Sequence, residues 1–116
     1  MTEINDIINK LKNNEEISGI VRKIDELGRI VIPIEYRKKI TSDKVINVAI
    51  NSVENYIVIE ILDDEQEDSQ KLDELGRVLI KMKLRNLLEW KEKDSIEIWS
   101  LGKYIILKKV EIKEGV

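Results

Sequence analysis

The 116-residue chain contains no cysteine, no histidine and no phenylalanine, and it has a single proline. Without cysteine, disulfide bonds and thiolate chemistry are excluded. Without histidine, the chain lacks the commonest general base and the commonest metal ligand in proteins. Only carboxylates, lysines and hydroxyls remain for catalysis, and none of them forms a convincing pair at catalytic spacing. We therefore expect a protein that is not an enzyme and that holds no metal or cofactor.

Long apolar runs are also missing. No segment approaches the length that crosses a membrane, and the N-terminus has no basic stretch followed by an apolar run. These features favour a cytoplasmic protein without a membrane partner, and no small-molecule substrate is evident. The net charge is −3, but residues 63–68 alone carry five acidic side chains, while residues 17–62 and 69–116 are each net positive. Because local patches decide binding, the acidic total does not exclude nucleic acid.

The chain contains an internal repeat. Shifting it by 48 positions aligns Lys23–Arg29 with Lys71–Arg77, and the alignment continues without a gap to pair Arg37 with Arg85. The sequence therefore predicts an N-terminal helical extension followed by two units joined by an acidic linker. Their boundaries are residues 1–16 for the extension, 17–62 for the first unit, 63–68 for the linker and 69–116 for the second unit.

Each unit is predicted to contain a strand, a tight turn, a strand, a short helix and a hairpin. The Asp25–Gly28 turn is expected to join two strands as a bulged hairpin, because Asp opens such turns and Gly tolerates positive φ. This prediction puts Arg22 and Arg29 on adjacent strands. Asn55 and Gly102 are expected to shape the later turns. The expected elements of the first unit are strands 20–25 and 29–32, helix 34–40, and strands 45–51 and 56–62; the second hairpin of the second unit is 95–100 and 104–110.

The N-terminal extension has apolar residues at helical spacing, namely Ile4, Ile7, Ile8 and Leu11. This pattern favours a short amphipathic helix docked on the rest of the protein or on a partner. A fraying tail is the alternative.

A single unit of fewer than fifty residues cannot bury enough surface to be stable alone, and its hairpins would expose unpaired strand edges. Two units on one chain can solve both problems by pairing their hairpins into one barrel. We therefore expect a barrel with pseudo-twofold symmetry inside one chain. The competing arrangement, a homodimer in which units pair between two chains, stays open.

The segment from Gly19 to Lys38 resembles the opening of the AbrB and SpoVT transition-state regulators of spore-forming bacteria. The resemblance extends to Leu62 and recurs, weakened, from Lys71 to Val110. It implies a mainly β fold with short helices, in which two units interlock as a swapped-hairpin (double-psi-like) AbrB barrel. It also implies a transcriptional regulator, with repression as the commoner role, that binds double-stranded DNA through one barrel face with a loose sequence preference.

The resemblance implies a set of basic DNA contacts, and the second unit departs from it. Gln70 stands where Arg22 stands, and Lys81 and Lys83 replace Pro33 and Glu35, so the second unit binds DNA differently or serves as the structural mate of the first. The opposing interpretation is that these arginines are solvated or paired with neighbouring acids. The candidate DNA-binding residues are Arg22, Lys23, Arg29, Arg37, Lys38, Lys71, Arg77, Lys81, Lys83 and Arg85.

Glycines and aromatic residues receive a structural rather than a functional interpretation. Gly28 and Gly76 are expected to serve turn geometry, because no helix begins directly after them to cradle a phosphate. The aromatic side chains are expected to pack in the core or at its rim rather than stack on bases. They are Tyr56, Trp90, Trp99 and Tyr104.

Two other functions are compatible with the sequence. A MazE-like antitoxin would share the barrel and bind DNA for autoregulation, but its long acidic tail is not expected here because Val116 closely follows the last predicted strand. A protein-interaction module whose basic residues are incidental is the other alternative.

Overall fold

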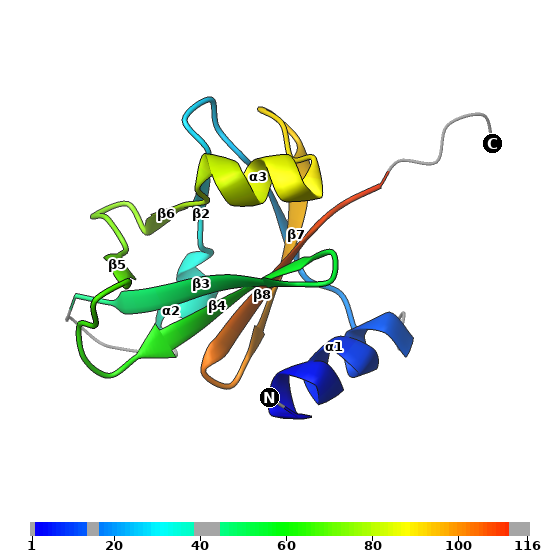
Figure 1. The fold of residues 1–116 in the computed structure, drawn as a ribbon, viewed down its shortest axis with the longest axis horizontal. Helices are drawn as coiled ribbons and strands as arrows, with labels where there is room; N and C mark the ends of the chain where they lie inside the picture. The colour runs from blue at the N-terminus through cyan, green and yellow to red at the C-terminus, as the bar shows by residue number, and fades with distance from the viewer. Residues whose placement is uncertain (1, 14–16, 39–44, 112–116) are drawn as a thin grey trace.

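The computed structural model describes residues 2–13, 17–38 and 45–111. Within these ranges the chain is mainly β with short helices, as predicted, and its largest sheet curls into a half-barrel (Figure 1). No helix in this part of the chain is long and apolar enough to cross a membrane. The elements are α1 (Thr2–Asn13), β1 (Ile20–Lys23), β2 (Arg29–Val31), α2 (Ile34–Lys38), β3 (Asn47–Val53), β4 (Tyr56–Leu62), β5 (Gln70–Lys71), β6 (Arg77–Leu79), α3 (Met82–Leu88), β7 (Ser95–Leu101) and β8 (Tyr104–Lys109).

The strands form a six-stranded sheet and a separate two-stranded ribbon. The order in the sheet is β1-β7-β8-β4-β3-β5, and β2 pairs with β6 to make the ribbon. The expected closed barrel is therefore a half-barrel in the described structure, because β1 and β5 remain the two edges of the sheet. Strands β4 and β8 lie at its centre and pair with each other, with Val58 opposite Ile106.

The two halves of the chain, residues 17–62 and 69–111, exchange their first strands. Strand β1 pairs with β7 of the second half, with Arg22 opposite Ile96. Strand β5 pairs in the same way with β3 of the first half, with Gln70 opposite Val48. Each half therefore supplies an edge strand to the hairpin of the other.

The predicted hairpin between the first two strands is wrong. Strands β1 and β2 belong to different sheets, and they remain in contact at the turn, where the Asp25 N–H donates to the Arg29 carbonyl at 2.9 Å. Beyond the turn the backbone leaves its local partner, because the Ile32 N–H donates to the Gly76 carbonyl of the other half at 2.9 Å. Arg22 and Arg29 are consequently not on paired strands.

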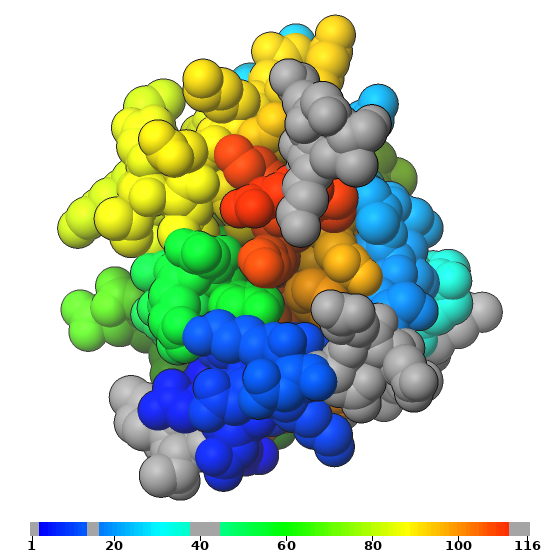
Figure 2. All heavy atoms as spheres, turned by 90° about the vertical axis from the view of Figure 1, so that its right-hand side faces the viewer, coloured from blue at the N-terminus to red at the C-terminus, as the bar shows by residue number. Residues whose placement is uncertain are grey.

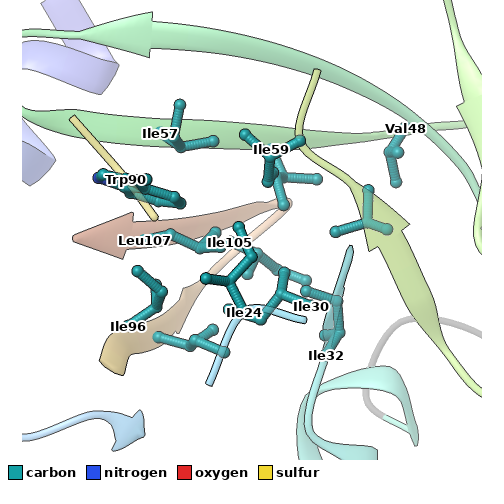
Figure 3. Close-up of a cluster of buried hydrophobic side chains, with 13 residues drawn as sticks. Ile24, Ile30, Ile32, Val48, Ile57, Ile59, Trp90, Ile96, Ile105 and Leu107 are labelled. Atoms are coloured by element: carbon teal, nitrogen blue, oxygen red, sulfur yellow. The ribbon is translucent and has the colours of Figure 1, made fainter. Parts of the chain in front are cut away.

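The central strands are buried on both faces, which explains their nearly continuous apolar sequences. In β4, Ile57 and Ile59 point into the main core, whereas Tyr56 and Val58 point to the opposite face of the sheet. Figure 3 shows Ile57 and Ile59 facing Ile24 and other side chains of the ribbon side of the molecule. Trp90, after α3, is buried at one end of the same cluster.

Helix α1 covers the other face of the sheet (Figure 2). Ile8 is completely buried against Tyr56, Trp99 and their neighbours. An ion pair from Lys12 to Glu54 ties the helix to the β3–β4 turn. The periodic apolar residues of the N-terminal segment thus form one side of a helix that is docked on the molecule.

The hairpin turns contain the residues expected there. Asn55 lies in the β3–β4 turn beside Glu54, which has positive φ, at 55°. In the β7–β8 turn Gly102 takes that place, as expected, with φ of 63°. The predicted end of the first short helix, residues 39 and 40, lies outside the described residues.

Candidate nucleic-acid interface

The β2–β6 ribbon places two of the candidate arginines side by side. In the antiparallel register, Arg29 lies opposite Leu79 and Val31 lies opposite Arg77. Ile30 and Val78, between them, are buried in the main core. Because alternate residues of a strand point to opposite faces, both arginines extend from the outward face of the ribbon. As diagonal neighbours, their backbones are separated by roughly 7–8 Å.

An aspartate orients the arginine of each turn. The Arg29 Nε donates to Asp25 Oδ2 at 2.8 Å, while Asp25 Oδ1 accepts the backbone N–H groups of Leu27 and Arg29. The second turn repeats this network: the Arg77 Nε lies 2.6 Å from Asp73 Oδ2, and Asp73 Oδ1 accepts two backbone N–H groups. One carboxylate therefore fixes both the turn and the arginine that follows it.

These hydrogen bonds also favour the charged carboxylates. Burial acts to raise the pKa of Asp25, but the hydrogen bonds from the backbone and guanidinium of Arg29 outweigh it and hold the pKa below its ordinary value. The pKa of Asp73 is lowered mainly by the backbone hydrogen bond from Arg77. Both aspartates thus remain ionised, and both arginines remain paired, at neutral pH.

A second arginine reaches each turn from the other half of the chain. The Arg85 Nε donates to the Ile80 carbonyl at 2.7 Å, and its guanidinium covers Gly28. The equivalent Arg37 donates to the Ile32 carbonyl at 2.9 Å and covers Gly76. Gly28 and Gly76 have φ of 86° and 77°, and a side chain on either would overlap the arginine above it. The structure therefore brings Arg29, Arg37, Arg77 and Arg85 together around the ribbon.

The other candidates lie around this group. Arg22 and Lys23 are exposed on the edge strand β1, and the Arg22 Nη1 donates to the Val21 carbonyl. Lys71 on β5 lies 3.8 Å from Glu65 of the linker, measured between Nζ and Oε2. Lys81 and Lys83 are exposed at the start of α3, and Lys38 ends α2, but its side chain is not among those described.

One short stretch of the chain matches a known protein. It is 76% identical over 21 residues to the "Transition state regulatory protein AbrB" of Bacillus subtilis (strain 168). The match covers 18% of this chain and 22% of that protein, so it supports at most an AbrB-like character for the matched stretch. No family model and no solved structure matches the chain.

Several features of the site were not predicted from the sequence. The Asp25–Arg29 pairing was considered only as an incidental ion pair, although the same spacing recurs in Asp73–Arg77 and could have indicated a shared turn design. The stacking of Arg85 on Gly28 joins residues far apart in sequence and leaves no local signal. Gln70 was noted only as a lost arginine, yet its amide group makes two hydrogen bonds to the Leu79 backbone, at 3.0 and 3.1 Å.

The glycines and three of the aromatic residues lie as predicted. Gly28 and Gly76 serve the turns, with positive φ, and no helix begins directly after either. The aromatic side chains of Tyr56, Trp99 and Tyr104 are buried under α1, so they are packing residues rather than exposed stacking platforms.

Proposed function

We propose that this chain is a DNA-binding transcriptional regulator of the AbrB type, acting as a repressor with a tolerant sequence preference. The proposal includes two tandem units, 17–62 and 69–116, joined by the acidic linker 63–68, that interlock as a swapped-hairpin barrel within one chain. The exchange of β1 and β5 between the halves supports this arrangement. The short AbrB match supports the functional class.

The outward pair of arginines on the β2–β6 ribbon is the observation that carries the proposal. A two-stranded ribbon fits the major groove of B-DNA, where arginine can bind phosphate oxygens or fork onto guanine. The Asp25 carboxylate engages Arg29 through Nε, so the end of the guanidinium is pre-oriented. Because an arginine held in this way loses less side-chain freedom on binding, the contact costs less entropy.

The charge balance around each turn favours an anionic partner. The first turn has three basic side chains, from Lys23, Arg29 and Arg85, and two acidic ones. The second turn likewise has three basic and two acidic side chains. The first half adds Arg22, where the second half has Gln70. We therefore propose that the first turn contributes more to affinity, with Lys38, Lys81 and Lys83 as peripheral phosphate contacts.

A tolerant sequence preference follows from the shape of the surface. A ribbon with few arginines reaches few base edges, whereas contacts to phosphate carry no sequence information. Discrimination between operators would then come largely from the cost of fitting DNA of different shape and stiffness to the protein.

The test is a titration of a duplex DNA with the wild-type protein, Arg29→Ala and Arg77→Ala at several salt concentrations. Each phosphate contact contributes about 0.9 to the slope of log affinity against log salt, so each variant is expected to lower the slope by about that amount. Lys10→Ala is the matched control, because it removes one exposed charge from α1, on the opposite face of the sheet.

The absence of binding by the wild-type protein at low salt would overturn the regulator proposal and leave the protein-interaction module. Equal binding by wild type, Arg29→Ala and Arg77→Ala would overturn the residue assignment. A loss confined to Arg29→Ala would assign the second unit a structural role.

A further inference from the structure

A small pocket lies where helix α3 of the second half meets the edge of strand β3 of the first half. Its volume is about 170 Å³, and its apolar lining comes from Val48, Ile50, Leu79 and Leu84. Polar groups of Gln70, Lys81 and Asp68 complete the lining. The pocket is separate from the arginine pairs of the two turns, none of which lines it.

The equivalent position, where helix α2 meets strand β7, is filled by the chain itself. Tyr36 of α2 occupies the place that Leu84 occupies in α3, 48 residues later. The Tyr36 hydroxyl donates a hydrogen bond to the Ile98 carbonyl on β7 at 3.1 Å. Burial raises the pKa of this hydroxyl, so it stays protonated and able to donate. The phenol ring of Tyr36 thus covers the surface that is equivalent to the pocket.

Two differences open the corresponding surface between α3 and β3. Leu84 is shorter than tyrosine and has no hydroxyl, so it leaves space above Val48 and Ile50. Strand β5 also begins late: β1 pairs with β7 from Ile98 onward, whereas β5 pairs only with Asn47 and Val48 of β3. No strand of the described structure therefore reaches Ile50, the counterpart of Ile98, on this edge.

The walls of the pocket are held in place without a ligand. The Gln70 side-chain amide donates to the Leu79 carbonyl and accepts from the Leu79 N–H, which fixes two lining residues to each other. Leu79 is further held by its pairing with Arg29 across the ribbon. A pocket that is formed in advance does not spend binding energy on ordering its own side chains.

We propose that this pocket binds a small phenol-type molecule, with the ring against Val48, Ile50 and Leu84 and the hydroxyl donating to the Ile50 carbonyl. The site reproduces, with an external ligand, the contact that Tyr36 makes with Ile98 inside the protein. At about 0.5 kcal/mol per non-hydrogen atom, within the range known for small ligands, a molecule of the size of methylphenol binds with a Kd on the order of 1 mM. The proposal does not depend on DNA binding.

The probe is 4-methylphenol, titrated into the isotopically labelled full-length protein while backbone amide shifts are recorded. Saturable shifts are expected at Val48, Ile50, Gln70 and Leu84. Toluene, which lacks the hydroxyl, is expected to bind about fivefold more weakly, the typical worth of one hydrogen bond.

Two variants test the assignment: one fills the pocket, and the other changes an exposed position of the same helix. Leu84→Tyr fills the pocket as Tyr36 fills its counterpart, and it is expected to abolish the saturable shifts. Leu87→Tyr, at an exposed position of the same helix, is the matched control and is expected to bind like wild type.

The proposal fails if wild type shows no saturable shifts at the pocket, or if Leu84→Tyr, folded by its thermal melt, binds like wild type. Should Leu84→Tyr not fold, Leu84→Phe, which fills the pocket with a ring that lacks the hydroxyl, decides: loss of the saturable shifts supports the proposal, and wild-type shifts in the folded variant overturn it.

Discussion

Gly28 and Gly76 each lie beneath an arginine that comes from the other half of the chain. Both have positive φ, a conformation that is costly for residues with a side chain. Both also lack room for a Cβ atom, because the guanidinium of Arg85 or Arg37 occupies that position. Conformation and space therefore both require glycine here, whereas Gly102 has positive φ but no neighbour within 4 Å of a Cβ.

We expect Gly28→Ala to destabilise the protein more than Gly102→Ala. Backbone strain costs about 1–2 kcal/mol at either position, and Gly28→Ala additionally displaces Arg85. Urea denaturation measures the free energies of unfolding, and the DNA titration should show a loss of affinity for Gly28→Ala alone. If the two variants changed stability and binding equally, the Arg85 guanidinium over Gly28 would not explain why this position requires glycine.

The turn residues illustrate what a sequence can predict about the site. Asp25 and Gly28 were placed in a turn because their types suit its positions, and that local prediction agrees with the structure. The resemblance to the AbrB family makes Arg85 a candidate DNA contact, but its position over Gly28 cannot be predicted from the sequence. That contact depends on how the two halves meet, and no spacing within either half encodes it.

Helix α1 is amphipathic, and its apolar side finds a partner in the outer face of the sheet. Tyr56, Val58, Tyr104 and Ile106 make this face apolar on the central strands β4 and β8. Without α1 these side chains would be exposed to solvent, and burying such a face is favourable. The helix therefore belongs to the core although it comes first in the chain.

Ile8→Ala is expected to loosen α1 without disturbing the ribbon. Truncating a fully buried isoleucine to alanine costs about 2–4 kcal/mol of stability. The loss cannot exceed the free energy that holds α1 on the sheet, because the helix undocks beyond that point. Amide hydrogen exchange in α1 should accelerate by roughly 30-fold to 1,000-fold, while DNA affinity stays unchanged. Asn9→Ala, on the exposed side of α1, is the control. Faster exchange throughout the sheet would mean that α1 holds the whole fold together.

The strands were predicted well from their sequences, but not all of their partners were. Hydrophobic, β-branched segments predict the second hairpins to within two residues at each strand end, because those strands pair with their neighbours in sequence. The partners of β1 and β2 were predicted wrongly, because a tight turn with Asp and Gly usually closes a local hairpin. The turn is indeed tight, but its two strands continue into different sheets.

Positive and negative side chains are concentrated in different parts of the molecule. The arginines surround the β2–β6 ribbon, whereas five acidic side chains are concentrated in residues 63–68, all of which are exposed. Replacing those five with amides would change the net charge from −3 to +2. The linker thus weakens long-range attraction to any polyanion.

We expect this neutralised linker to raise DNA affinity by roughly tenfold at low ionic strength, and by less than about twofold at 0.5 M salt, where such interactions are screened. Thermal stability should change little because these residues are exposed. Fluorescence anisotropy across a salt series measures the effect, with Gln66→Asn as a charge-neutral linker control. Equal affinities at low salt would show that the linker charges do not act on the binding face.

The exchange of edge strands has a consequence for biosynthesis. Ile20 pairs with Ile98, so β1 must wait until most of the chain has left the ribosome before its partner exists. Contacts between residues so far apart in sequence close large loops and are typical of slower folding. Until β7 emerges, the nascent first half presents unpaired strands on which chaperones or a neighbouring nascent chain could act. Completion of the fold is therefore tied to completion of translation.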